Sequence, residues 1–259
     1  MGVLNVTPDS FSDGGRYAST EAAVSHGLRL VADGADVVDV GGEATGPRAT
    51  PVTAAEELRR VVPVVERLAG AGVAVSVDTT KAEVARAAVR AGARYVNDIS
   101  GGLFDPAMGE AVAESGAIYI CGHLRGRSLR EVFGDERRAV TWTEVAAELA
   151  ERLAALPPEV RARAWGDPGI GFGKGADPAT NGELLRRAGD LSRELGCPVM
   201  VGPSRKRFLR AGLGAEPSEL DLDRATVAAC LDAVRGGANM LRVHNVALLH
   251  GALTAYNKG

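Results

Sequence analysis

The sequence predicts a (β/α)8 TIM barrel, in which a parallel eight-stranded barrel forms a single domain over residues 1–259. Three observations lead to this fold class: a helix-to-strand junction that recurs along the chain, strands that are apolar throughout, and polar side chains at the strand ends. The length of the chain is typical of such a barrel. A doubly wound open sheet is the alternative arrangement of the same elements.

The recurring junction is a glycine, a small residue and then an apolar run rich in β-forming residues. It occurs five times, beginning at Gly34, Gly92, Gly116, Gly196 and Gly237. Glycine tolerates the left-handed backbone that ends many helices, so each junction marks a helix end and a strand start. Three further strands are expected at Val3–Val6, Val73–Val77 and Arg163–Gly166. The strands are continuously apolar, as a sheet buried on both faces requires.

Helices are expected between the strands, and several have recognisable starts. Thr53 and Thr80 each begin a capping box, while Asp105 and Asp177 each precede a proline that suits the first helical position. After Thr53 the apolar residues fall on one helical face, namely Leu58, Val61, Val62, Val65 and Leu68.

Composition and charge narrow the class of protein. Hydrophobic residues make up 46% and charged residues 24%, so a large core is expected. The formal net charge of -3 argues against nucleic acid or an anionic membrane as the main partner. Cys121, Cys197 and Cys230 are expected to be buried free thiols. With no apolar run of membrane-spanning length, the sequence predicts a cytoplasmic enzyme.

Every predicted strand ends in polar or ionisable side chains. In strand order these are Asn5, Asp39 with Glu43, Asp78, Asn97 with Asp98, His123, Asp167, Ser204 with Lys206, and Arg242 with His244. Each has a common structural explanation when taken alone, such as a helix cap or a turn residue. Because functional groups collect at the carboxyl ends of barrel strands, the whole set on one rim predicts a site.

The strand-end residues divide into two chemical groups. Asp78, Asn97 and Asp167 suit a flat heterocycle with an amino-pyrimidine edge, because a carboxylate accepts two parallel bonds from an N–H/NH2 pair. The second group suits a phosphate-bearing ligand, since it lies on strands one, seven and eight. Its members are Asn5, Lys206, Arg242 and His244.

The cationic stretch Ser204–Arg207 needs an anion, a carboxylate or water, because three unpaired charges cannot be buried. A Mg²⁺ ion that arrives with a diphosphate needs few protein ligands, and Asn5 with Asp13 could supply them. The long, Gly-rich connections 7–19 and 41–52 are predicted to be mobile lids. Segment 126–141 carries no recognisable chemistry and is expected to be solvated.

These motifs resemble dihydropteroate synthase of the folate pathway, over essentially the whole chain. The matching segments, in chain order, are Met1–Gly15, Asp36–Glu43, Asp78–Thr79, Asn97–Asp98, Asp167–Gly169, Phe172–Lys174, Ser204–Lys206 and Arg242–His244. The resemblance implies a pterin-binding barrel that joins 6-hydroxymethyl-7,8-dihydropterin diphosphate to p-aminobenzoate. It also implies Mg²⁺ and a homodimer.

The resemblance implies a role for each matching residue. The pterin residues would be Asp78, Asn97, Asp167 and Lys206, and the diphosphate residues would be Asn5, Arg242 and His244 with Mg²⁺. The aminobenzoate residues would be Thr45, Pro47, Phe172, Lys206 and Arg207, with Phe11 and Asp13 from the first loop. The residues expected to act in catalysis are Lys206, Asp13, Asp167, Arg242 and His244.

The chemistry of such a reaction requires no general base, because a neutral arylamine has a free lone pair. Stabilisation is needed for the departing diphosphate, by Arg242 and His244, and for positive charge on the pterin methylene, by Asp167 and Asp13. We expect a dissociative displacement at carbon.

The sequence departs from the family pattern at several positions. Gly46 stands where a loop arginine is expected, and Arg48 two residues later is a candidate replacement. Asn245 replaces an aspartate after the Arg-Val-His motif, and Gly122 replaces a methionine. These departures leave two alternatives: a pterin-binding paralogue without catalysis, and a corrinoid-linked methyltetrahydrofolate methyltransferase. The second would have no use for Ser204–Lys206 or the first-loop motif.

Overall fold

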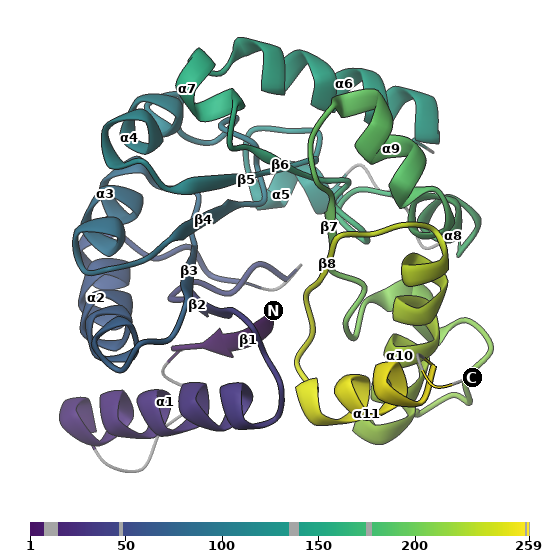
Figure 1. The fold of residues 1–259 in the computed structure, drawn as a ribbon, viewed down its shortest axis with the longest axis horizontal. Helices are drawn as coiled ribbons and strands as arrows, with labels where there is room; N and C mark the ends of the chain where they lie inside the picture. The colour runs from purple at the N-terminus through teal and green to yellow at the C-terminus, as the bar shows by residue number, and fades with distance from the viewer. Residues whose placement is uncertain (8–14, 47–48, 135–139, 175–177, 257, 259) are drawn as a thin grey trace.

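The computed structural model describes residues 1–7, 15–46, 49–134, 140–174, 178–256 and 258, and for residues 15–19 only the backbone. Phe11, Asp13, Pro47, Arg48 and Asp177 therefore lie outside the described side chains. Strands face a common centre and helices surround them (Figure 1). The strands are β1 (Gly2–Asn5), β2 (Val38–Gly41), β3 (Val75–Asp78), β4 (Tyr95–Asp98), β5 (Ile118–Gly122), β6 (Trp165–Asp167), β7 (Met200–Val201) and β8 (Met240–Leu241).

The strands form a closed parallel ring. Strands β1 to β6 pair in sequence order, and β7 pairs with β8. Two single parallel bridges join these sheets, one between Gly2 and Val243 and the other between Gly166 and Val199. The predicted (β/α)8 barrel is confirmed, and the open doubly wound sheet is wrong.

The helices cover the outside of this ring less evenly than predicted. They are α1 (Gly15–Ala32), α2 (Ala54–Gly70), α3 (Ala82–Arg90), α4 (Met108–Ser115), α5 (Leu129–Gly134), α6 (Trp142–Ala155), α7 (Pro158–Arg161), α8 (Pro178–Arg186), α9 (Ala188–Leu195), α10 (Glu219–Arg235) and α11 (Val246–Tyr256). Three of them follow β5 and two follow β6, while the 3-10 helix η2 (Arg207–Arg210) precedes α10. The strict alternation of one helix per strand is therefore wrong at these connections.

The five junction glycines have the left-handed backbone that the repeat predicts. Their φ angles are 103° at Gly34, 110° at Gly92, 71° at Gly116, 65° at Gly196 and 84° at Gly237. A side chain disfavours this conformation, so glycine lets each helix end and the chain turn directly into the next strand. This local rule explains why the barrel could be recognised from sequence.

The helix starts follow the predicted caps only in part. The Thr53 hydroxyl accepts a bond from the amide three residues later at 3.2 Å, as predicted for α2. Helix α3 begins at Ala82 without a side-chain cap from its preceding residue, so the Thr80 box is wrong. Instead the Asp105 carboxylate accepts from the Ala82 amide at 2.7 Å and from the Ala107 amide at 3.0 Å. A residue of the next βα unit thus caps α3.

Two apolar layers hold the barrel together. The larger one lies between sheet and helices, where α2 buries Val61, Val65 and Leu68 completely and half-buries Leu58 and Val62, as predicted. The smaller cluster takes one residue from each strand or the residue just before it: Met1, Val37, Ala74, Tyr95, Ile120, Trp165, Met200 and Met240. Because its members come from all round the ring, this cluster fills the barrel interior.

Two further sequence expectations concern the whole chain. Cys121, Cys197 and Cys230 are free thiols; the first and last are buried as predicted, and Cys197 is half-buried. Among the helices that the structure describes, none is long and apolar enough to cross a membrane.

Candidate active site

A hydrogen-bonded network at the barrel mouth joins four strands. Arg242, directly after β8, donates from Nε to Asp39 Oδ2 and from Nη2 to Asp78 Oδ2, both at 2.6 Å. The Asn97 side-chain amide donates to the same Asp39 oxygen at 3.0 Å. The predicted heterocycle-binding residues Asp78 and Asn97 are therefore brought together, with Asp39 and Arg242 between them.

The network leaves acceptors available at the mouth. Asp78 and Asn97 are 8% and 1% exposed, and Asn97 Oδ1 is buried without a hydrogen-bond partner among the described residues. Burial raises the pKa of Asp78 to about 7, while the Arg242 guanidinium opposes this rise. A ligand that donates hydrogen bonds here would satisfy groups that the protein leaves unsatisfied.

Asp167 lies at the end of β6 and is 7% exposed. Its Oδ1 accepts a bond from the Gly169 amide at 2.8 Å. Burial raises the pKa of this carboxyl, and the nearby charges of Lys206 and Lys174 act in the opposite direction. A carboxylate so placed can accept from a heterocycle or stabilise a nearby positive charge.

Lys206 and Phe172 meet at the mouth, as predicted. The Lys206 ammonium lies 3.5 Å from the centre of the Phe172 ring, within cation–π range. The lysine stem runs along the loop after β6, where a Cβ on Gly171 would lie 2.9 Å from Lys206 Cδ. Burial, and secondly the charge of Arg242, lowers the pKa of Lys206 to about 8. Lys206 thus carries its charge into the site from β7.

The cations beside Lys206 have different environments. Arg205 has a φ of 57°, and its side chain binds Asp223 through Nε at 2.8 Å, so a carboxylate compensates this cation. Arg207 is exposed at the start of η2. The left-handed backbone at Arg205 turns successive side chains in different directions, so that Lys206 alone of the three is directed onto the Phe172 ring.

His244 is held by Ser204, with 2.8 Å between its Nδ1 and the serine oxygen. Burial, reinforced by the charges of Arg242 and Arg205, lowers the pKa of His244 to about 4, so the imidazole is neutral at pH 7. Asn245 donates to Asp223 at 2.9 Å. An aspartate at position 245 would set two carboxylates against each other, whereas Asn245 can donate to Asp223.

Asn5 stands exposed at the end of β1 and converges with Asp78 over Gly41. A Cβ on Gly41 would lie 3.7 Å from Asn5 Oδ1 and 3.6 Å from Asp78 Oδ2. An amide oxygen suits Mg²⁺, which prefers oxygen ligands. In the described part of the chain, no group of three His, Cys, Asp or Glu side chains could hold a metal ion. An oxygen donor such as Asn5 therefore fits a metal ion that takes most of its other ligands from a bound substrate.

Two of the strand-end residues serve the framework and do not face the mouth, and a third is held in an ion pair. His123 Nε2 lies 3.0 Å from Glu148 of α6, and the His123 side chain is 1% exposed. Asp98 accepts from the Ser100 amide and the Tyr119 hydroxyl, both at 2.8 Å. Glu43 is paired with Lys81. The expectation that every strand end contributes to one site is wrong, because side chains here can also turn toward the outer helices.

Lys174 is a site residue whose role the sequence did not suggest. It is 1% exposed, and its ammonium donates to the carbonyls of Phe172 at 2.9 Å and His123 at 3.1 Å. The Asn181 side chain of α8 accepts from the Gly171 amide at 2.8 Å. Both contacts fix the loop that carries Phe172. The sequence signal for this role was a single lysine in an otherwise apolar and glycine-rich stretch.

Next to the network lies a cavity of about 880 Å³. It is lined by Glu43, Thr45, Gly46, Ala49, Pro51, Val52, Glu57, Asp78, Thr79, Thr80, Lys81, Ile99, Phe104, Asp105, Arg127, Ser128, Leu129, Arg130, Phe133 and Gly134. Thr45 and Asp78 thus share one cavity, and the Phe133 ring on its wall lies 6.1 Å from the Phe172 ring.

Helix α5 forms part of this cavity wall, so the expectation of a solvated loop or helix is wrong for its apolar face, although Arg130, Glu131 and Gly134 are exposed. Leu129, Val132 and Phe133 pack with Phe172 and Ile99 in a separate apolar cluster. Their spacing along the chain fits one face of a helix, which is the signal that sequence reasoning overlooked.

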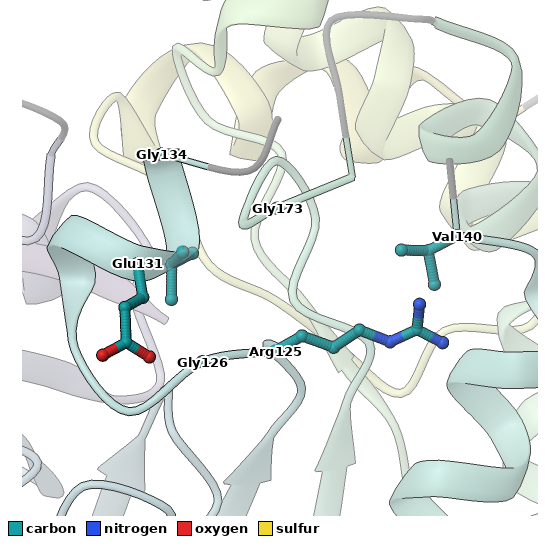
Figure 2. Close-up of a pocket in the computed structure, with 7 residues that line it drawn as sticks. Arg125, Gly126, Glu131, Gly134, Val140 and Gly173 are labelled. Carbon is teal, nitrogen blue, oxygen red and sulfur yellow. The ribbon is translucent and has the colours of Figure 1, made fainter. Parts of the chain in front are cut away.

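A smaller pocket of about 420 Å³ lies behind α5 and is lined by Arg125, Gly126, Glu131, Val132, Gly134, Val140 and Gly173. Figure 2 shows the Arg125 side chain extending toward Val140, with Glu131 on the opposite wall. Arg125 is paired with Glu144 at 3.0 Å and also with Glu148, so its charge is compensated. None of the predicted site residues lines this pocket.

The fold and the mouth define a (β/α)8 barrel enzyme whose site combines buried carboxylates with cations. A family model of pterin binding enzymes matches residues 1–244. Dihydropteroate synthase of Mycobacterium leprae is 45% identical, over 95% of this chain and 88% of its own length.

Solved structures agree with this match. Dihydropteroate synthase of Xanthomonas albilineans with 4-aminobenzoic acid has a TM-score of 0.87 at 44% identity, covering 100% of this chain and 91% of that one. The same enzyme in complex with 7,8-dihydropteroate has a TM-score of 0.85 at 42% identity, covering 100% and 92%. The chain belongs to the pterin binding enzymes, and among them to the dihydropteroate synthase family.

Proposed function

We propose that the protein condenses 6-hydroxymethyl-7,8-dihydropterin diphosphate with p-aminobenzoate, giving 7,8-dihydropteroate and diphosphate in folate biosynthesis. It is a transferase in this proposal. The observation that carries it is the network at the mouth, in which Arg242 bonds to Asp78 and to Asp39, and Asn97 bonds to the same Asp39. Relatives of at least 42% identity that are named for this reaction support it.

The pterin ring binds Asp78, Asn97, Asp167 and Lys206 in this proposal. Asp78 accepts from the N–H/NH2 edge of the ring, for which a carboxylate has matching geometry. Asn97 Oδ1, buried and without a described partner, accepts a further ring N–H. The charged Lys206, whose pKa the charges of Asp167 and Asp78 both raise, donates to the ring carbonyl.

The diphosphate binds Asn5, Arg242 and His244. The Ser204 hydroxyl donates to His244 Nδ1 when the imidazole is neutral, and this leaves the proton on Nε2 to donate to a phosphate oxygen. Asn5 with Asp13 would hold Mg²⁺, which would supply additional positive charge next to the diphosphate.

Aminobenzoate lies between Thr45, Pro47, Phe172, Lys206 and Arg207. Its ring packs near Phe172, which Lys174 and α5 hold in place. Its carboxylate faces the exposed Arg207 at the start of η2. Phe11 is a further member of the aminobenzoate site in this proposal.

The reaction proceeds by displacement at the pterin methylene carbon. The bond from this carbon to the diphosphate oxygen breaks as the arylamine nitrogen bonds to the carbon, and the amine then loses one proton to solvent. Asp167 and Asp13 stabilise the positive charge that develops on the pterin, and Arg242 and His244 stabilise the leaving group. The transition state is dissociative, and a kinetic isotope effect typical of a tight, associative one would contradict this.

The decisive assay measures diphosphate release as a function of p-aminobenzoate, with and without Mg²⁺. We expect release that requires both substrates, and a loss of at least about a hundredfold in kcat/KM for Lys206→Met, since charge stabilisation of this kind is worth that much. Lys258→Met is the matched control, because Lys258 is exposed beyond α11.

A different outcome would indicate the alternative function. If the wild-type protein binds the pterin diphosphate but releases no diphosphate with p-aminobenzoate present, the protein is a pterin-binding paralogue without catalysis. Methyl transfer from methyltetrahydrofolate to a corrinoid would indicate the methyltransferase.

We further propose that the protein is a homodimer, as the family resemblance implies. Light scattering on the purified chain tests this, and a monomer at micromolar concentration would contradict it. A cytoplasmic location, to which the three free thiols are suited, stays a prediction that fractionation of cells tests.

A further inference from the structure

Beyond the residues already assigned, we propose that Asp39 is a positioning residue for the pterin site. Asp39 accepts hydrogen bonds from Arg242 Nε and from the Asn97 side-chain amide. Because Arg242 keeps this partner, its bond to Asp78 can break when the heterocycle binds Asp78. The inference rests on the proposed function, because it takes the ligand of Asp78 to be an amino-pyrimidine edge.

Asp39 lies deeper in the barrel than Asp78. In the strand register Asp39 is opposite Ser76, whereas Gly41, two residues further on, is opposite Asp78. Asp39 is fully buried, and the side chain of Arg242 is 19% exposed. The guanidinium therefore spans two levels, with Nε on the deep carboxylate and Nη2 on the carboxylate at the mouth.

The two bonds of Arg242 have different consequences. A carboxylate that is fully buried needs a compensating positive charge, so the Nε bond to Asp39 must persist. The Nη2 bond to Asp78 lies where the substrate is proposed to bind. When the N–H/NH2 edge takes both oxygens of Asp78, Arg242 keeps Asp39 as its counter-ion. Its Nη2 then becomes available to the diphosphate.

Asp39 also orients Asn97. Because the Asn97 NH2 group donates to Asp39, the amide oxygen must point elsewhere, and it is buried without a partner among the described residues. One carboxylate thus presents Asn97 as an acceptor and holds Arg242 as a movable donor. Neither role requires Asp39 to contact the substrate.

The test uses Asp39→Asn in the full chain, which removes the charge and keeps the size. The probe is 6-hydroxymethylpterin without diphosphate, titrated by its fluorescence. Arg242 then depends on Asp78 for its ion pair and competes with the ring. We expect the Kd of the pterin and the KM of its diphosphate to rise at least about tenfold, or ~1.4 kcal/mol. The KM for p-aminobenzoate should change less than about twofold.

A second variant separates positioning from a structural role. Asp39→Asn combined with Arg242→Met removes the competitor and the buried charge together. This variant should bind the pterin ring within about threefold of wild type while its affinity for the diphosphate stays low. Because the double variant has no charge at either position, it still tests the proposal if the single variant fails to fold. A ring affinity that stays more than about tenfold below wild type in the double variant would overturn the proposal.

The matched control is Asp98→Asn, another fully buried carboxylate, bonded to Ser100, Gly102 and Tyr119. This variant should lower the melting temperature without weakening the binding of 6-hydroxymethylpterin. Unchanged pterin affinity in a folded Asp39→Asn variant would contradict the role of Asp39. Absence of diphosphate release by the wild type would instead contradict the proposed function, so the two failures are distinguishable.

Discussion

Single residues at the barrel mouth carry buried charges that differ in how closely they are paired. Arg242 has two carboxylates within hydrogen-bond distance, and one of them, Asp39, is fully buried. Lys206 has no such close carboxylate among its described contacts, and burial lowers its pKa to about 8. The paired arginine thus links two buried carboxylates, while the lysine is available to titrate near neutral pH.

The pairing of Arg242 predicts a large effect on stability. Arg242→Met should lower the free energy of unfolding by about 3–5 kcal/mol, because it leaves the buried carboxyl groups of Asp39 and Asp78 without their cation. Adding Asp39→Asn should recover most of that loss. Urea denaturation measures both effects. Arg205→Met is the control: Arg205 is 33% exposed, so the loss should be smaller. Additive losses in the double variant would contradict the prediction.

The lowered pKa of Lys206 predicts the alkaline limb of the pH profile. A lysine loses its charge as the pH rises, so kcat/KM should fall as the pH rises through about 8. Burial is the first cause of this pKa, followed by the charge of Arg242. Lys206→Arg should move the limb to higher pH, because arginine stays charged. If the Lys206→Arg variant shows the alkaline limb at the same pH, another group causes that limb.

Elements of the barrel are tied to each other by contacts that cross between βα units. Asp105 precedes α4 yet caps the start of α3, and Lys174 connects the loop after β6 to the end of β5. Helix α5 packs its apolar face on Phe172. The loops that form the mouth are therefore positioned by neighbouring units, and the site depends on the ring as a whole.

The two caps that Asp105 provides predict an unusually costly substitution in a loop. Asp105→Ala removes the bonds to the amides of Ala82 and Ala107, so α3 and the turn before α4 both lose a cap. At about 1 kcal/mol for each cap, unfolding free energy should fall by about 2 kcal/mol. Thr53→Ala, which removes a single cap from α2, should cost about half as much. Equal losses would refute the shared cap.

The loop 41–52 predicts that an arginine at position 46 can replace Arg48. If Arg48 replaces the arginine absent at Gly46, Arg48→Ala should raise the KM of the pterin diphosphate by about tenfold, since one charge-assisted contact is lost. A Cβ at Gly46 meets no atom within 4 Å, so an arginine fits there. Gly46→Arg in the Arg48→Ala background should restore the KM. No effect of Arg48→Ala on kcat or KM would contradict the replacement.

For the whole molecule, the sequence predicts the barrel fold but only some of the contacts between side chains at the barrel mouth. Junction glycines such as Gly34 and Gly237 are local signals, because the left-handed backbone depends on the residue itself. Contacts within the mouth are not local: Arg242 and Asp39 are 203 residues apart, and Asn97 and Asp39 are 58 apart. Periodicity and spacing do not encode such pairs.

The same limit explains the residues that were misjudged. A polar residue at a strand end can face the mouth, as Asp78 does, or the outer helices, as Asp98 and His123 do. The last residues of a strand alternate between these sides, but the register that decides the side appears only when neighbouring strands pair. Asp39 was visible as a strand-end carboxylate, and its link to Arg242 required the closed ring.

The most direct measurement is the formation of 7,8-dihydropteroate, followed by mass spectrometry, in a mixture of the pterin diphosphate, p-aminobenzoate and Mg²⁺. The wild-type protein should form the product with repeated turnover. Asp78→Asn should lose at least about a hundredfold in kcat/KM, because the ring loses a charge-assisted pair of hydrogen bonds. No product from the folded wild-type protein, or full activity in Asp78→Asn, would contradict this assignment of the barrel mouth.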